Sequence, residues 1–214
     1  MVGNIGYNTQ LTASIQEPLQ LYYDDFDANG SIDPLLCYFV DGQSYPFVSR
    51  DDLLGQLPYL KKKFLFFKDY AKAQIQDILT PTQLEASKKL EVTTLATTYF
   101  DNQNGQFIAK ALPVEAQIAP VQTIQSLGVN GDKHLDLILA GNQFNNRVKL
   151  GRMDSNHGMV FMDNGKGNFE LVPANQTGIY FEGVVQNSAK TKVVQNKGSL
   201  FEVNNEFVEL YQLK

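Results

Sequence analysis

The sequence predicts an all-β chain of repeated antiparallel strands, interrupted by an α-helical insertion over about residues 49–90. Short runs with alternating apolar residues are separated by turns rich in Asn and Gly, which is the pattern of consecutive strands. One hairpin pattern occurs twice, as "TYFDNQNGQFIAKALP" and as "VFMDNGKGNFELVPAN", and internal repetition of this kind is typical of repeat architectures. Only the stretch from Ser49 to about Lys89 changes to helical spacing of its apolar residues.

The first strand pair, within residues 19–40, encloses a polar loop whose side chains suit calcium. Oxygen-bearing residues occupy loop positions 1, 3, 5 and 9, and Gly30 at position 6 allows the turn. Calcium prefers several such hard oxygen ligands at about 2.3–2.6 Å. Without a cation, each close pair of carboxylates repels by about 4 kcal/mol at an effective dielectric constant near 20. The expected ligands are the side chains of Asp25, Asp27, Asn29 and Asp33, with the backbone carbonyl of Ser31.

The sequence leaves one alternative to this calcium loop open and excludes another. Asp, Asn and Gly are ordinary turn residues, so the same stretch also suits a plain polar turn between strands. An EF-hand is excluded, because the segment after Asp33 is apolar and strand-like and lacks the bidentate Glu and the flanking helix.

A second loop, in "SLGVNGDKHLDLILAGN", matches the first less well. With Asp136 at position 9, Asn130 falls at position 3 and Asp132 at position 5. Gly128 replaces the first ligand and Lys133 replaces the glycine at position 6. We therefore expect a degenerate second site that binds calcium weakly or not at all.

The two loops, each followed by an apolar strand, resemble the FG-GAP/VCBS repeat, whose pattern is Asp-x-Asp-x-Asn/Asp-Gly-x-x-Asp. The run "DFDANGSIDPLLCYF" with the helices after it is similar to the C-terminal portion of long surface proteins of Bacteroidetes-type bacteria. The resemblance implies about three β-propeller blades in a single domain, residues 1–214, located outside the cell or in the cell envelope. Closed propellers have at least four blades, so we expect a partial propeller, or one completed by self-association through blade edges.

Local signals place the helices and the last strands. Ser49 with Asp52 forms a capping box, a second helical segment runs from Pro58 to Leu79, and Thr80 with Gln83 caps another helix. After Pro173 we expect four short strands, with turns at 187–188, 196–198 and 204–205.

Composition narrows the function. A net charge of −5 with 19 % charged residues argues against a nucleic-acid partner. Cys37, the single cysteine, and two histidines are too few for a zinc site. Ser155, His157 and Asp154 could be combined into a catalytic triad, but the sequence around them lacks the nucleophile elbow. We therefore expect that the chain is not an enzyme. No apolar run is long enough to span a membrane.

The sequence therefore predicts a calcium-binding module of a secreted or cell-surface protein that binds a protein or a polysaccharide. The alternative is a non-catalytic part of a larger enzyme that acts on polysaccharide.

Overall fold

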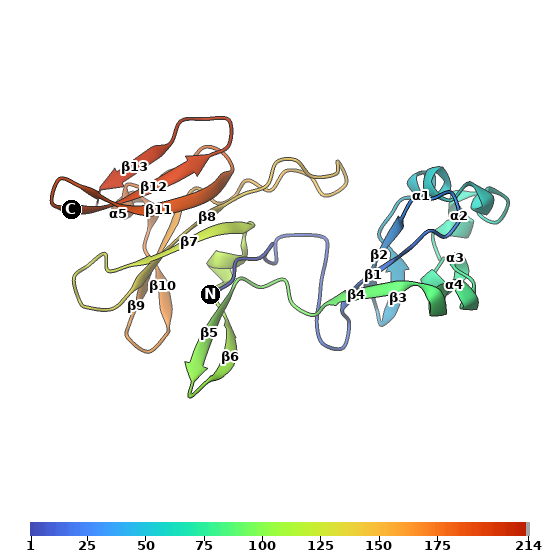
Figure 1. Cartoon of the computed structure of the whole chain (residues 1–214), viewed down its shortest axis with the longest axis horizontal. Coiled ribbons are helices and arrows are strands. Elements are labelled where there is room, and N and C mark those ends of the chain that lie inside the picture. Colours follow the sequence, from blue (N-terminus) through green and yellow to red (C-terminus); the bar gives the residue numbers. More distant parts are fainter. Residues whose placement is uncertain (213–214) are drawn as a thin grey trace. The chain divides into compact units, whose positions relative to one another are not determined.

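The computed structural model describes residues 1–212, and strands dominate it, with 38 % of residues in strands and 16 % in helices. The described strands form four antiparallel sheets, none of which closes on itself. The expected all-β class is therefore confirmed at this level (Figure 1). The chain folds as two compact units: unit 1 contains residues 1–10 and the chain from Leu95 onward, and unit 2 is Leu11–Thr94. The single propeller-type domain expected over residues 1–214 stays a prediction.

Unit 2 is a four-stranded sheet with helices packed on one face. From Asp33 to Tyr38 in β2, buried residues alternate with exposed or half-buried ones, because successive side chains point to opposite faces of a sheet. Leu35 and Cys37 are fully buried and contact the helices. The sheet order is β3-β2-β1-β4, with β1 at Leu19–Asp24, β2 at Asp33–Val40, β3 at Gln43–Pro46 and β4 at Lys88–Val92.

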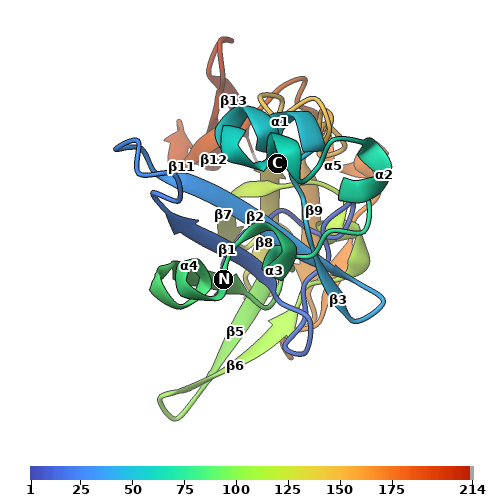
Figure 2. The same cartoon turned by 90° about the vertical axis from the view of Figure 1, so that its right-hand side faces the viewer.

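The helices of unit 2 lie between β3 and β4 in the chain, and they lie in front of β1 and β2 in Figure 2. Both predicted caps form: the Ser49 hydroxyl accepts from the Asp52 amide, and the Thr80 hydroxyl accepts from the Gln83 amide. The helical elements are α1 (Arg50–Gln56), the 3₁₀ helix η1 (Pro58–Lys62), α2 (Phe67–Tyr70), α3 (Ile75–Ile78) and α4 (Pro81–Ala86).

Two details of the predicted helical insertion are wrong. Its last residues are strand, because Lys88–Val92 pair with the free edge of β1 and form β4. The segment from Pro58 to Leu79 is broken into short pieces rather than one helix. A continuous helix would use the carbonyls of Phe64 and Leu65, but both accept hydrogen bonds from the Arg50 guanidinium instead.

Unit 1 contains the repeated hairpins, and both form as predicted. The first hairpin is β5 (Thr98–Gln103) with β6 (Gln106–Ala111), and the second is β9 (Met159–Asp163) with β10 (Phe169–Leu171). The second hairpin continues the sheet of β7 (Val121–Leu127) and β8 (Asp136–Gly141), so β7 to β10 form a four-stranded meander. The short helices are η2 (Val114–Gln117) and α5 (Ala174–Thr177).

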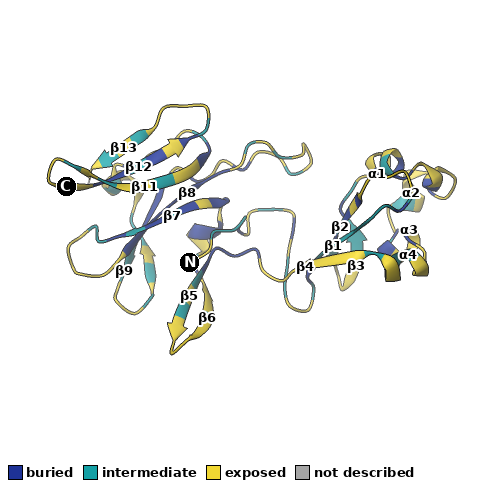
Figure 3. Ribbon diagram, in the orientation of Figure 1, coloured by how far each residue is buried: buried dark blue, intermediate teal, exposed yellow. Residues whose placement is uncertain are grey.

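The core of unit 1 surrounds β8, in which every residue is buried, while β6 is almost entirely exposed (Figure 3). Phe161, Phe181 and Phe201 are fully buried in it. The third sheet of this unit has three strands: β11 (Val185–Val193), β12 (Asn196–Val203) and β13 (Glu209–Gln212).

The four strands predicted after Pro173 are thus three. Asn187 and Ser188 lie within β11 at a β-bulge, not in a turn. The Ser188 hydroxyl is held 2.5 Å from the Thr123 hydroxyl of β7, so a tertiary contact keeps the strand extended. The next turn falls at 194–195, ahead of the predicted place, and the turn at 204–205 forms as expected.

Candidate metal centre

The acidic loop connects β1 to β2, as the sequence predicts. One carboxylate oxygen from each of Asp25, Asp27 and Asp33 lies within 4.8 Å of the other two. Among residues 1–212, no ion pair involves any of these three carboxylates. Three negative charges therefore share one small volume without a cationic side chain.

Backbone amides fix the acidic side chains in place. Asp25 accepts hydrogen bonds from the amides of Asn29 and Gly30, at 2.9 and 2.8 Å. Asp27 accepts a further bond from Asn29 at 3.2 Å, and the Asn29 side-chain oxygen accepts from Ser31 at 2.8 Å. The chain reverses here because Gly30 has a φ of 87°, a value that glycine adopts without strain. The loop thereby presents a preorganised set of hard oxygen donors, which is the donor chemistry that calcium requires.

Asp33 joins the loop to the core. It is only 3 % exposed, and its Oδ2 accepts a hydrogen bond from the amide of buried Phe26 at 3.0 Å. Its Oδ1 accepts none from the part of the chain that the structure describes. This oxygen is therefore free to bind a cation beside the carboxylates of Asp25 and Asp27.

The second loop has the same backbone as the first. Every pair between β1 and β2 recurs between β7 and β8 with both numbers raised by 103, as when Tyr22–Leu35 becomes Gln125–Ile138. The positive φ values of Ala28 and Gly30 recur at Gly131 and Lys133.

The buried aspartate of the second loop is bound in the same way. Asp136 is fully buried, and its Oδ2 accepts from the amide of Val129 at 2.7 Å, as Asp33 does from Phe26. These correspondences support the alignment that places Asp136 at position 9.

Both carboxylates of the second loop have donors on both oxygens, whereas Asp27 and Asp33 of the first loop each keep one oxygen without a donor among the described residues. The Oδ1 of Asp136 accepts from the amide of Asp163 at 3.1 Å, and Asn130 donates from its side chain to Asp132 at 2.8 Å. Hydrogen bonds from the His134 amide and from Asn130 lower the pKa of Asp132. These contacts leave fewer free ligands for calcium than the first loop offers.

A cationic side chain also lies beside the second loop. The Lys197 ammonium donates to the carbonyl of Gly128, the residue at position 1, at 3.3 Å. Sequence reasoning identified the missing ligand at Gly128 but not Lys197, which is 69 residues away and carries no local signal.

The residues weighed for a catalytic triad do not form one. His157 Nδ1 is 2.9 Å from the Phe181 carbonyl, so this nitrogen carries the proton, and Asp154 pairs with Arg152 at 3.2 Å instead. His157 and Asp154 line an open hollow of about 460 Å³ with Tyr180, whose ring stacks on His157.

Comparison of the chain with protein-family models, with curated proteins and with solved structures finds no match. None of the helices within residues 1–212 combines the length and the apolarity that a membrane-spanning helix needs.

Proposed function

We propose that this chain is a calcium-binding β-repeat module in which the ion occupies the loop between β1 and β2. The observation that carries the proposal is the set of three carboxylates within 4.8 Å of one another, with no cationic partner among the described residues. A divalent cation would cancel their repulsion and fix the turn between the two strands. Asn29 and the carbonyl of Ser31 complete the proposed ligand set.

The repeated hairpin supports the proposal that the chain contains β-propeller blades. The same hairpin, with the same register and the same buried aspartate, occurs in both units. The meander β7-β8-β9-β10 has the strand order of a propeller blade. On this proposal the second loop keeps the shape of a repeat and holds calcium weakly, through Asn130, Asp132 and Asp136.

Calcium affinity suggests where such a module acts. Loops of this kind fill at the calcium concentrations found outside cells, about 0.1–1 mM, and not at those of a resting cytosol. We therefore propose a secreted or cell-surface module that binds a protein or a polysaccharide.

Isothermal calorimetry of the full chain tests the metal proposal. We expect one dominant calcium site, no comparable heat with magnesium, and loss of the site in Asp27→Ala. Asp132→Ala is the matched control, because it removes a carboxylate from the second loop and leaves the first loop intact. An equal affinity of the parent chain and of Asp27→Ala for calcium would contradict the proposal.

A further inference from the structure

The break between η1 and α2 exposes three large apolar side chains in a row. Leu65 is 62 % exposed, Phe66 is 56 % exposed and Phe67 is 66 % exposed. Phe64, directly before them, is buried in the core of unit 2. The described part of unit 2 therefore anchors this segment at one end and leaves Leu65–Phe67, here called the apolar tip, more than half exposed.

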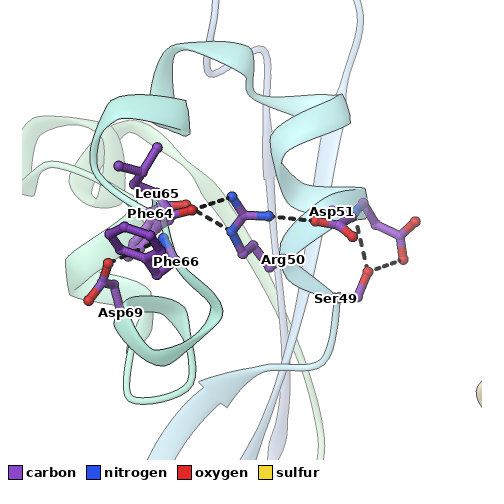
Figure 4. Close-up of polar contacts among 8 residues, drawn as sticks. Ser49, Arg50, Asp51, Phe64, Leu65, Phe66 and Asp69 are labelled. Atoms are coloured by element: carbon purple, nitrogen blue, oxygen red, sulfur yellow. Dashed lines mark hydrogen bonds and ion pairs between the residues drawn. The ribbon is translucent and has the colours of Figure 1, made fainter.

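Arg50 binds the backbone where the apolar tip begins. Its guanidinium donates from Nε to the carbonyl of Phe64 and from Nη2 to the carbonyl of Leu65, both at 2.8 Å (Figure 4). Asp51 binds the third guanidinium nitrogen at 2.7 Å, and the group also lies 4.9 Å from the centre of the Phe67 ring. Two backbone carbonyls are thus bound by an oriented side chain that is itself only 16 % exposed.

The other carbonyls of the segment are also hydrogen-bonded within the protein. Phe66 accepts from the amide of Asp69 at 3.0 Å, and Phe67 accepts from the amide of Ala71 at 2.9 Å. The Asp69 carboxylate in turn accepts from the Phe66 amide (Figure 4). All four carbonyls from Phe64 to Phe67 therefore have donors. These bonds fix the backbone conformation in which the three apolar side chains are exposed.

Lysines flank the apolar tip on both sides in the sequence. Residues 61–72, "KKKFLFFKDYAK", contain five lysines and one aspartate, a net charge of +4 in a chain whose net charge is −5. All five lysines are exposed. The Lys68 ammonium lies 5.5 Å from the centre of the Phe66 ring, so cationic and apolar groups share one small surface.

We propose that this surface docks on an anionic phospholipid bilayer. The apolar tip enters the headgroup region, and the lysines bind the lipid phosphates and carboxylates around it. Apolar side chains flanked by lysines are the combination that binds such interfaces. Pairing of the apolar tips of two copies is disfavoured, because it brings two surfaces of charge +4 together. The association is peripheral and independent of the metal loop.

Sedimentation of the full chain with lipid vesicles tests the proposal, with and without calcium. We expect binding to vesicles of phosphatidylcholine with phosphatidylglycerol, weak or no binding to phosphatidylcholine alone, and release at high salt. Lys61→Gln with Lys62→Gln should weaken binding by about fivefold per lysine. Phe66→Ser with Phe67→Ser should weaken it at least tenfold.

Matched controls come from unit 1. Lys190→Gln with Lys192→Gln removes the same charge from exposed positions of β11, and Val194→Ser with Phe207→Ser removes side chains that are 93 % and 90 % exposed. Both control pairs should bind vesicles like the parent chain. Equal losses in control and test pairs would overturn the proposal, because binding would then follow net charge or hydrophobicity alone.

Thermal melting separates docking from internal packing. The Phe66→Ser and Phe67→Ser pair should melt within a degree or two of the parent chain. A large drop in melting temperature with unchanged vesicle binding would overturn the proposal, since the apolar tip would then be covered by protein. Failure of the parent chain to bind anionic vesicles, or binding to an acidic protein in their place, would also overturn it.

Discussion

Substituting Asp33 with Asn should change the stability in opposite directions with and without calcium. Asn has the same shape, and its side-chain oxygen can still accept the hydrogen bond from the Phe26 amide. The substitution removes one negative charge from the three-carboxylate cluster. Without calcium this relieves repulsion, whereas with calcium it deletes a ligand.

The structure sets the size of both effects. Two unit charges 4.8 Å apart repel by about 3.5 kcal/mol at an effective dielectric constant near 20. Asp25 and Asp27 are only half-buried, so solvent screening reduces the relief to about 1–2 kcal/mol in total. Calcium at about 100 times its dissociation constant stabilises the parent chain by about 2.7 kcal/mol. Asp33→Asn loses most of this stabilisation, so in calcium it is less stable than the parent chain.

Asp136→Asn is the matched comparison at the same position of the second loop. Both carboxylate oxygens of Asp136 accept hydrogen bonds from backbone amides, one from Val129 and one from Asp163. An Asn side chain would turn its amide group toward one of these donors and leave that donor without an acceptor. We expect a loss of about 1–3 kcal/mol, with or without calcium.

Urea unfolding of the parent chain and both variants, in calcium and in chelator, measures these differences. The prediction is a crossover for Asp33→Asn and parallel losses for Asp136→Asn. If Asp33→Asn destabilised the chelated protein as much as Asp136→Asn does, the three carboxylates would not repel, and the reasoning about the loop would be refuted.

Two further predictions concern the backbone and the core. Gly30→Ala should lower the free energy of unfolding in urea by about 1–2 kcal/mol, because Gly30 has a φ of 87°. An added Cβ meets no atom within 4 Å, so the loss measures backbone strain alone. An unchanged free energy of unfolding would contradict the positive φ. Burial raises the pKa of the Cys37 thiol to about 12, so Ellman's reagent at pH 8 should label the folded protein far more slowly than the unfolded one. Labelling of the folded chain at the rate of the unfolded chain would disprove the burial of Cys37. Since the pKa of the buried thiol lies above the ordinary value near 9, the contribution of Cys37 to stability should decline as the pH rises from about 9 towards 12.

Sequence reasoning succeeded where short-range signals decide the structure. The caps at Ser49 and Thr80 depend on residues three positions apart, and the hairpin turns depend on Asn and Gly within a few residues. The acidic loop was located for the same reason, since its spacing is contained in nine residues.

Long-range contacts account for what the sequence could not predict. The helix expected after Pro58 is broken because Arg50 reaches carbonyls 14 and 15 residues away. The turn expected at Asn187 became a bulge because Ser188 contacts β7. In the second loop, the extra amide from Asp163 comes from a strand 27 residues away from Asp136. The local residue patterns of turns, caps and ligand loops do not reveal contacts with residues that are distant in the sequence.

The most direct test of the calcium loop is a crystal structure grown in calcium and measured at a wavelength where calcium scatters anomalously. The account predicts an ion at about 2.3–2.6 Å from oxygens of Asp25, Asp27 and Asp33, and weaker or no density in the loop that ends at Asp136. A loop at 25–33 without an anomalous peak, in crystals soaked well above millimolar calcium, would contradict it.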